Sequence, residues 1–359
     1  GFDQHQQTFG AFHSFISLYR RAQFALLSSC WFICDIVMFD RIAYNRKGGI
    51  CVTTHFYSHP VCLTHEPGPH HPESPDRLRA VMQVLANSEF DGLVRFEAPE
   101  TTPDVIALMH DSGYVDHILA SVPANGYAQL DPDTILSPGS GEAALRAVGG
   151  ICQAVDDVIS GQADNAFCAL RPPGHHAEHA QAMGFCLFNN IAIAAKHAQV
   201  SHGLDKIAVI DFDVHHGNGT QHMFDADASL FYGSSHQFPA YPGTGAASET
   251  GIGNIVNVPL SPGSGSEPFR AAYTDVILPA LREFNPDLLL ISAGFDAHIQ
   301  DPLCQLNVTT ADFAWISEEL LAAADTCCDG RLVSTLEGGY DLEALAESVA
   351  VHVGEMMAE

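Results

Sequence analysis

The stretch IAVIDFDVHHGNGT, residues 207–220, decides the fold and contains a candidate metal site. It opens with β-branched and apolar residues, which are typical of a buried strand, and it ends in a glycine-rich turn. Because side chains of an extended segment alternate between two faces, Asp211, Asp213 and His215 should share one side. A carboxylate and an imidazole two residues apart can chelate one ion. The stretch therefore predicts a strand that presents metal ligands at its C-terminal end.

A third ligand is predicted in another segment. ISAGFDAH, residues 291–298, follows a second apolar run and presents Asp296. Asp213, His215 and Asp296 would leave an open coordination position, which is a property of catalytic rather than structural metal sites. Two carboxylates and one imidazole suit Zn²⁺ but also Fe²⁺, Co²⁺ or Mn²⁺. Such an ion polarises a scissile carbonyl and lowers the pKa of bound water.

The adjacent histidines of the segment RPPGHHAE need partners that fix their tautomers. Asp211, at the end of the first strand, is placed to pair with one ring, and Asn218 can pair with the other. A carboxylate raises the pKa of an imidazole more than a neutral amide does, so the two rings should differ in charge. We therefore expect His176, beside Asn218, to act as general base. His175, beside Asp211, should be the more cationic electrostatic partner.

The segment LEGGYD, residues 336–341, offers a donor for the oxyanion that develops during hydrolysis. A strand that ends in two glycines lets the backbone swing Tyr340 into the site. Its hydroxyl could then bond the carbonyl oxygen opposite the metal. Taken alone, Tyr340 is better explained as a turn residue beside a helix cap at Asp341. Together with the other motifs, it is better explained as a catalytic residue.

The composition is that of a globular and strongly acidic protein. The chain has 359 residues, of which 47% are hydrophobic, and a formal net charge of −28. Residues 1–51 hold five basic and three acidic residues, so the negative charge lies in the remainder. Such a surface opposes nucleic acid and anionic lipid and attracts cationic ligands, such as lysine-rich peptides or polyamines. We expect no nucleic-acid partner and no membrane contact for the acidic body, although solubility alone explains the charge equally well.

Residues 1–51 differ from the rest of the chain. Two arginines precede an apolar and aromatic stretch, residues 22–39, which Gln23 and Asp35 interrupt. The stretch is similar to a secretory or anchoring segment, but it lacks a well-defined cleavage site. It is an anchor, a helix docked on the body, or an upstream stretch translated from a start codon placed too early. We favour the last, because the first convincing strand begins only at Cys51.

The ten cysteines form no CxxC pair and have no regular spacing. Most lie in apolar stretches, as reduced core thiols do. They favour a cytoplasmic location.

After residue 51, apolar runs bounded by turn residues alternate with helical patterns. The expected strands are residues 51–58, 166–170, 206–211, 230–234, 255–258, 288–292 and 332–336. The expected helices are residues 75–86, 141–160, 190–200, 267–284, 310–326 and 342–353. This alternation predicts an α/β protein with a mainly parallel sheet covered on both faces, whose ligands bind beyond the carboxyl ends of the strands. No linker divides residues 52–359, which we expect to form a single catalytic domain.

The ordered motifs RPPGHHAE, GFCLFNN, DFDVHHGNGTQ, SAGFDAH and LEGGYD resemble the zinc-dependent histone deacetylase family, in its class II-like and bacterial amidohydrolase branch. The similarity extends from about His55 to the C-terminus. It implies a three-layer arginase/deacetylase fold with an eight-stranded parallel sheet, and hydrolysis of an acyl group from an amine. In that family the matching positions are the zinc ligands, the histidine pair and the tyrosine on the carbonyl, here Asp213, His215 and Asp296, His175 and His176, and Tyr340.

The resemblance also implies details of the pocket. Asn218 is the form of class II-like members, and a tyrosine at position 340 is what members active on acetyl-lysine carry. Gly184 and Phe185 match one wall of the substrate tunnel, with Tyr241 opposite.

Further positions follow from the same resemblance. A structural potassium ion is implied beside the zinc, held by Asp211, Asp213, His215, Ser234 and Ser235. Arg77 matches a residue of an internal exit channel. Either Asp131 or Asp133 is expected to bond a substrate backbone.

The substrate is less well defined than the chemistry. Leu303, seven residues after Asp296, matches acyl-lysine hydrolases, whereas one polyamine-preferring type carries glutamate there. We expect an acylated lysine peptide or a small acylated amine as substrate, with a side activity on esters. Because the acidic body also attracts polyamines, an acetylpolyamine amidohydrolase stays open. A homo-oligomer is compatible with all these features.

Two rival functions remain. The ureohydrolases of the same fold use two manganese ions and need a further aspartate where the segment after Phe295 reads Asp-Ala-His. Two metal ions in the catalytic centre would support that alternative. A binding module that has lost turnover is the other rival, but such modules typically lack a ligand or the tyrosine.

Overall fold

The computed structural model describes residues 52–358, so the predictions made for residues 1–51 lie outside the described part. Within residues 52–358, none of the helices combines the length and the apolar character that crossing a bilayer requires.

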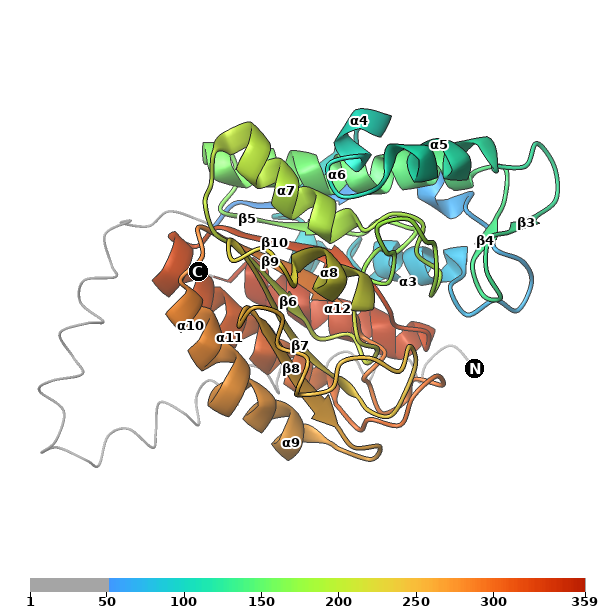
Figure 1. Ribbon diagram of the computed structural model, residues 1–359. Helices are drawn as coiled ribbons and strands as arrows, with labels where there is room; N and C mark the ends of the chain where they lie inside the picture. The colour runs from blue at the N-terminus through green and yellow to red at the C-terminus, as the bar shows by residue number, and fades with distance from the viewer. Residues whose placement is uncertain (1–51, 359) are drawn as a thin grey trace, which may run out of the picture. The chain divides into compact units, whose positions relative to one another are not determined.

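A sheet of eight parallel strands forms the centre of the domain (Figure 1). In sheet order the strands are β2 (Val94–Glu97), β1 (Thr54–Ser58), β5 (Asn165–Cys168), β10 (Leu332–Leu336), β9 (Leu288–Ala293), β6 (Ile207–Asp211), β7 (Leu230–Gln237) and β8 (Ile255–Leu260). Every neighbouring pair is parallel. The four central strands, β5, β10, β9 and β6, are fully buried, which explains why their sequences are mainly apolar. The predicted fold class is confirmed.

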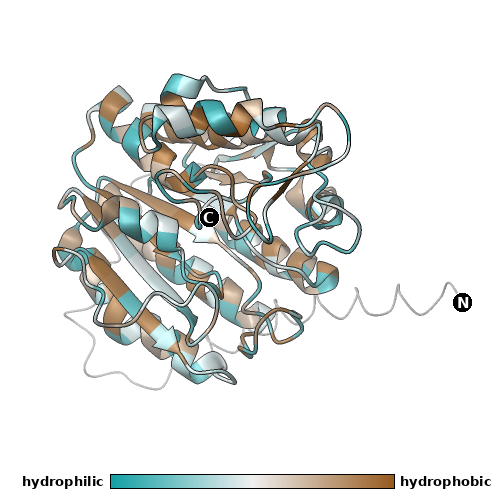
Figure 2. Cartoon of the chain, turned by 45° about the vertical axis from the view of Figure 1, so that its right-hand side comes forward, coloured by the Kyte–Doolittle hydropathy of each residue, from teal (hydrophilic) through white to brown (hydrophobic). Residues whose placement is uncertain are grey.

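Helices cover both faces of the sheet (Figure 1). One layer contains α6 (Ser140–Ser160) and α7 (Asn190–His202), with α4 (Pro103–Ile106) and α5 (Ser112–Ala120) beside them. The other layer contains α3 (Pro75–Val84), α11 (Thr310–Cys328) and α12 (Leu342–Met356), followed by α9 (Ser266–Ala271) and α10 (Leu278–Phe284). Figure 2 shows hydrophobic colours along the inner strands and mixed colours on the helices, as expected for helices with one buried face.

The structure differs from the prediction mainly at the periphery. Strand β2 was not predicted, because it is a four-residue edge strand whose side chains are all exposed. The short β3 (Ala128–Gln129) and β4 (Ile135–Leu136) form a separate antiparallel pair. The predicted helix 267–284 is continuous but contains a π-helical segment, Ala272–Ile277, between α9 and α10.

The register of the central strands brings the predicted motifs to one edge of the sheet. Asp211, the last residue of β6, is paired with Ser292 of β9 on one side and with Ser234 of β7 on the other. Leu336, the last residue of β10, is paired with Ala293. The segments that follow β5, β10, β9 and β6 therefore leave the sheet side by side, at the carboxyl ends where α/β proteins bind ligands.

His352 of α12 makes the stability of the domain sensitive to acid. Its imidazole is buried between two hydroxyls, 2.6 Å from Ser317 Oγ and 2.9 Å from Ser334 Oγ, and burial lowers its pKa to about 3. Below about pH 6.5 the unfolded chain takes up a proton that the folded chain refuses, so the free energy of unfolding should fall as the pH falls towards 3. In urea unfolding between pH 6 and 5, His352→Gln should have a slope against pH that is smaller by up to about 1.4 kcal/mol per unit. If the wild type and His352→Gln had equal slopes, His352 would not be a source of this pH dependence.

Candidate functional site

The three predicted metal ligands meet beyond the ends of β6 and β9. Asp213 and His215 follow β6, Asp296 follows β9, and all three side chains are buried. One ligand atom of each lies within 4.8 Å of the others. His215 Nδ1 is 3.1 Å from Asp213 Oδ1 and 3.0 Å from Asp296 Oδ2. The structure thus brings together the two sequence segments that were predicted to share an ion.

The electrostatics of this cluster fit a bound cation. Burial and the neighbouring carboxylate of Asp213 raise the pKa of Asp296 to about 7. Two buried carboxylates face a single imidazole, and buried negative charge requires a positive partner. A divalent cation with oxygen and nitrogen ligands supplies that charge.

Two glycines let the backbone approach these carboxylates closely. The amide of Gly338 donates to Asp213 Oδ2 at 2.8 Å. A Cβ atom at Gly338 would lie 2.1 Å from Asp296 Oδ2, and one at Gly294 would lie 2.0 Å from Asp213 Oδ2. The glycines of LEGGYD were expected to make the backbone flexible, but the structure shows that Gly338 is required because the backbone approaches both carboxylates closely.

The two adjacent histidines have different partners. His175 Nδ1 lies 2.9 Å from Asp211 Oδ2, and His176 Nδ1 lies 2.8 Å from Asn218 Oδ1. The ring centroids are 4.0 Å apart. These are the pairs predicted from the order of the motifs.

These partners give the two rings opposite charge preferences. Burial opposes the charged form of His175, but the carboxylates of Asp211, Asp213 and Glu337 outweigh it and raise the pKa to about 10. For His176, burial and the positive charge of His175 both hold the pKa well below its ordinary value. These opposite shifts favour a cationic His175 and a neutral His176 at neutral pH, and the difference between the two pKa values has the predicted direction.

Tyr340 follows β10 and is held by its backbone and its ring. Gly339 has a φ of 121°, and the amide of Tyr340 donates to Asp301 Oδ2 at 2.6 Å. The guanidinium of Arg77 lies 4.9 Å from the centroid of the tyrosine ring, and the ring of Phe185 lies 6.0 Å away. Burial raises the pKa of the phenol well above its ordinary value, so the hydroxyl keeps its proton.

Arg77, which the family resemblance assigns to an exit channel, contacts the segment before Tyr340. It is fully buried, and its Nε donates to the carbonyl of Gly339 at 2.6 Å. Its other nitrogens donate to the carbonyl of Glu337 and, at 2.9 Å, to Glu73 Oε1. Arg77 therefore fixes the course of the LEGGYD segment.

Two buried acidic residues that were not predicted, Glu73 and Glu337, anchor this region. Glu73 lies between Arg171 and Arg77, and these cations outweigh burial and lower its pKa to about 2. Glu337 accepts hydrogen bonds from the amides of Gly174 at 2.7 Å and His175 at 3.3 Å. Glu337 belongs to the motif LEGGYD and Arg171 to the motif RPPGHHAE. In both motifs, a charged residue next to an apolar strand was the signal that could have identified them.

The predicted tunnel residues surround the site. Gly184 and Phe185 both have positive φ, and a Cβ atom at Gly184 would lie 2.4 Å from His176 Cδ2. The ring of Tyr241 is 5.1 Å from the ring of His176. Leu303 is 36% exposed and precedes Cys304, whose Sγ lies 3.6 Å from His215 Nε2.

The two aspartates considered for substrate binding lie in the turn beside this wall. Asp131 Oδ1 accepts from the amides of Asp133 and Thr134, at 2.9 and 3.0 Å. Asp133 Oδ1 accepts from the amide of Gly184 at 3.2 Å. Both contacts stabilise the wall, and binding of a substrate backbone stays a prediction.

The residues of the predicted potassium site are buried and close to Asp211. Ser234 is the register partner of Asp211, and its Oγ lies 2.9 Å from His236 Nδ1. Ser235 Oγ lies 2.8 Å from the hydroxyl of Tyr273. Potassium binding there stays a prediction.

Comparison with known proteins places this site in a family. A family model described as a histone deacetylase domain matches residues 71–356. Histone deacetylase 14, chloroplastic, of Arabidopsis thaliana is 39% identical over 80% of this chain and 73% of its own length. The histone deacetylase-like amidohydrolase of Pseudomonas aeruginosa is 36% identical, over 80% and 81%.

A solved structure gives the same result. The crystal structure of the HDA15 HD domain has a TM-score of 0.80 and 36% identity, and the match covers 85% of this chain and 88% of that chain. The chain therefore belongs to the histone deacetylase family, whose members are deacetylases and amidohydrolases acting on amide bonds.

Proposed function

We propose that this protein is a metal-dependent deacylase that removes acetyl or other acyl groups from lysine side chains. The observation that carries the proposal is that His175 pairs with the carboxylate of Asp211 and His176 with the amide of Asn218, beside the cluster of Asp213, His215 and Asp296. When their environments push the pKa values of two neighbouring titratable groups apart, the two groups can take separate acid and base roles.

Each residue then has a specific task. Neutral His176 accepts the proton of the attacking water as the new C–O bond forms, and it returns that proton to the amine as the C–N bond breaks. Asn218 Oδ1 accepts from Nδ1 of His176 and so leaves Nε2 free to take the proton. Cationic His175, which Asp211 orients, stabilises the negative charge that develops on the acyl group.

Tyr340 and the cation complete the site. The tyrosine hydroxyl, which keeps its proton, donates a hydrogen bond to the carbonyl oxygen. Asp213, His215 and Asp296 would hold a divalent ion, zinc in most of the family, which supplies Lewis acidity when bound. The same arrangement should cleave activated esters, because an ester is the better acyl donor.

The proposal is tested with metal-replete protein and a panel of acyl-lysine peptides, acetylated polyamines and uncharged acetylated amines. We expect the highest kcat/KM on an acyl-lysine peptide. If no member of the panel turns over while the metal is bound, the chain is a binding module and the proposal is wrong.

Acetylpolyamine hydrolysis is a second candidate because acidic residues gather around the tunnel wall. Burial raises the pKa of the Tyr241 phenol above its ordinary value, and the nearby carboxylates of Asp133, Asp131 and Glu178 raise it further. These carboxylates would attract the distal ammonium group of an acetylated polyamine. A preference for an acetylated diamine over an acetylated monoamine of equal length, weakening as salt is added, would favour this candidate.

The cysteines favour a reducing compartment such as the cytoplasm. Seven cysteines in the described part of the chain are free thiols, and most are buried. Free thiols are usual where disulfides do not persist.

A further inference from the structure

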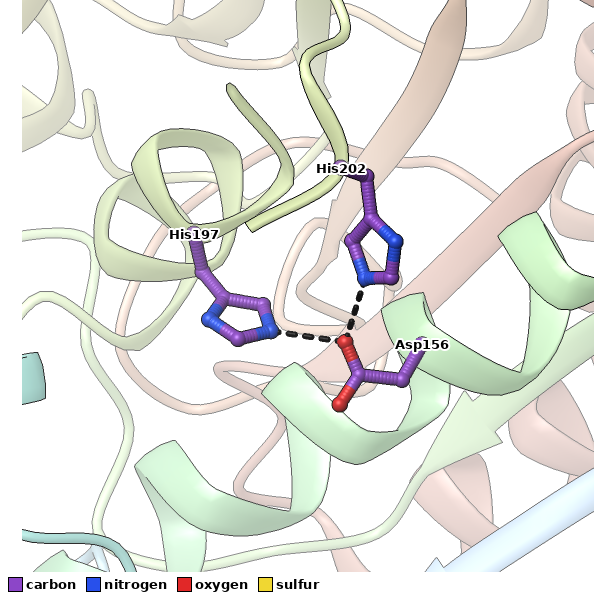
Figure 3. Close-up of side chains that lie close together, drawn as sticks. All are labelled: Asp156, His197 and His202. Atoms are coloured by element: carbon purple, nitrogen blue, oxygen red, sulfur yellow. Dashed lines mark hydrogen bonds and ion pairs between the residues drawn. The ribbon is translucent and has the colours of Figure 1, made fainter. Parts of the chain in front are cut away.

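Three side chains form a second cluster of metal-ligand type on the layer of α6 and α7 (Figure 3). Asp156 comes from α6, and His197 and His202 come from α7. His197 Nε2 lies 2.7 Å from Asp156 Oδ1, and His202 Nε2 lies 2.6 Å from the same oxygen. The two imidazoles and the carboxylate therefore converge on one point, as Figure 3 shows.

The cluster lies where the backbone favours positive charge. His202 is the last residue of α7, and Asp156 and His197 lie about one turn before the ends of α6 and α7. The C-terminal end of a helix carries partial negative charge and stabilises a nearby cation. Lys196, the neighbour of His197, contacts Asp227 instead, at 3.8 Å.

The hydrogen bonds around His197 also suit a metal ligand. Ser201 Oγ lies 3.2 Å from His197 Nδ1 and can accept from it, which leaves Nε2 as the ligating nitrogen. Metal-binding histidines are commonly oriented by such a partner on the other nitrogen.

The geometry needs only a small adjustment to hold a metal ion. Ligands about 2.0–2.1 Å from a tetrahedral ion are about 3.3 Å apart, somewhat farther than the present N–O distances. The side chains are 14% (His197), 25% (His202) and 36% (Asp156) exposed, so they can rotate and leave room for water ligands. In the metal-free cluster each Nε2 carries the proton that it donates to Asp156, so a metal ion would bind as that proton moves to Nδ1 or, from a doubly protonated ring, is released to water.

We propose that Asp156, His197 and His202 bind a divalent transition-metal ion of the Zn²⁺ type, separate from the catalytic centre, and that this ion fastens the end of α6 to the end of α7. Two imidazoles and one carboxylate suit Zn²⁺, Co²⁺ or Ni²⁺ better than Mg²⁺ or Ca²⁺. The ion should therefore stabilise the fold without taking part in the hydrolysis.

The test is the number of Zn²⁺ ions bound per full-length chain after equilibrium dialysis, together with the Tm. The double variant His197→Gln/His202→Gln should bind one ion fewer than the wild type, and Asp296→Asn should lose a different one. Zn²⁺ at a hundredfold excess over its Kd should raise the Tm of the wild type by several degrees more than that of the double variant. Lowering the pH to 5.5 should weaken binding, because protons compete for both imidazoles.

His117→Gln is the matched control, because His117 is an exposed histidine on α5. It should keep the wild-type number of ions. Should the double variant bind as many ions as the wild type, or should the control lose as much as the double variant, this site does not exist. If only the ion assigned to Asp296 fails to bind, the result contradicts the proposed function and leaves this inference intact.

Discussion

Tyr340→Phe should lower kcat on an acetyl-lysine peptide by about 10²–10³-fold, the usual cost of removing one donor to a developing oxyanion. The substitution removes only the hydroxyl. The ring keeps its contacts with the guanidinium of Arg77 and with Phe185, and the backbone keeps its hydrogen bond to Asp301. Because none of these groups is a proposed metal ligand, the metal content should not change.

Tyr241→Phe provides the control for this experiment. Tyr241 also lies near the histidine pair, with its ring 5.1 Å from that of His176, but its hydroxyl has no proposed role in the chemistry. Its loss should change kcat by less than about tenfold. If Tyr340→Phe had as small an effect as Tyr241→Phe at equal metal content, the assignment of Tyr340 to the carbonyl oxygen would be wrong.

The central strands and the ligands that follow them could be predicted because the signals are local. Buried parallel strands such as β6 and β9 appear as unbroken apolar runs, and a polar residue directly after such a run lies at the carboxyl edge of the sheet. The spacing of two between Asp213 and His215 follows from the alternation of side chains. The partners of His175 and His176 were predictable for the same reason, since Asp211 ends β6 and Asn218 lies only seven residues further on.

The buried charges around the site could not be predicted in this way. Glu73 is 98 residues from Arg171 in the sequence, and nothing local indicates that the two form a buried ion pair. Glu337 directly follows an apolar strand, but nothing local indicates its contacts with the amides of Gly174 and His175, which are 163 and 162 residues away in the sequence. The cluster of Asp156, His197 and His202 is likewise formed by two helices that the sequence leaves unpaired.

Gly338→Ala should abolish tight metal binding and lower kcat/KM by at least about 10²-fold, because misplacement of catalytic groups by about 1 Å has an effect of that size. The new Cβ atom would lie 2.1 Å from Asp296 Oδ2 and 2.5 Å from Asp213 Oδ2. Both are carboxylate oxygens of proposed metal ligands, and both carboxylates are buried and hydrogen-bonded to the backbone, so they have little room to move aside. Gly338 does not have a positive φ, so the penalty comes from space and not from backbone conformation.

Gly354→Ala separates this effect from a general intolerance of alanine. Gly354 lies in α12, and an added Cβ atom there meets nothing within 4 Å. Because alanine is favoured over glycine inside a helix by up to about 1 kcal/mol, this variant should keep its metal and gain stability. Zn²⁺ content and kcat/KM are measured for both variants, with circular dichroism to confirm that each is folded. A folded Gly338→Ala protein with wild-type metal content would show that Asp213 and Asp296 do not hold the ion, because the added methyl group fills the space that their oxygens occupy.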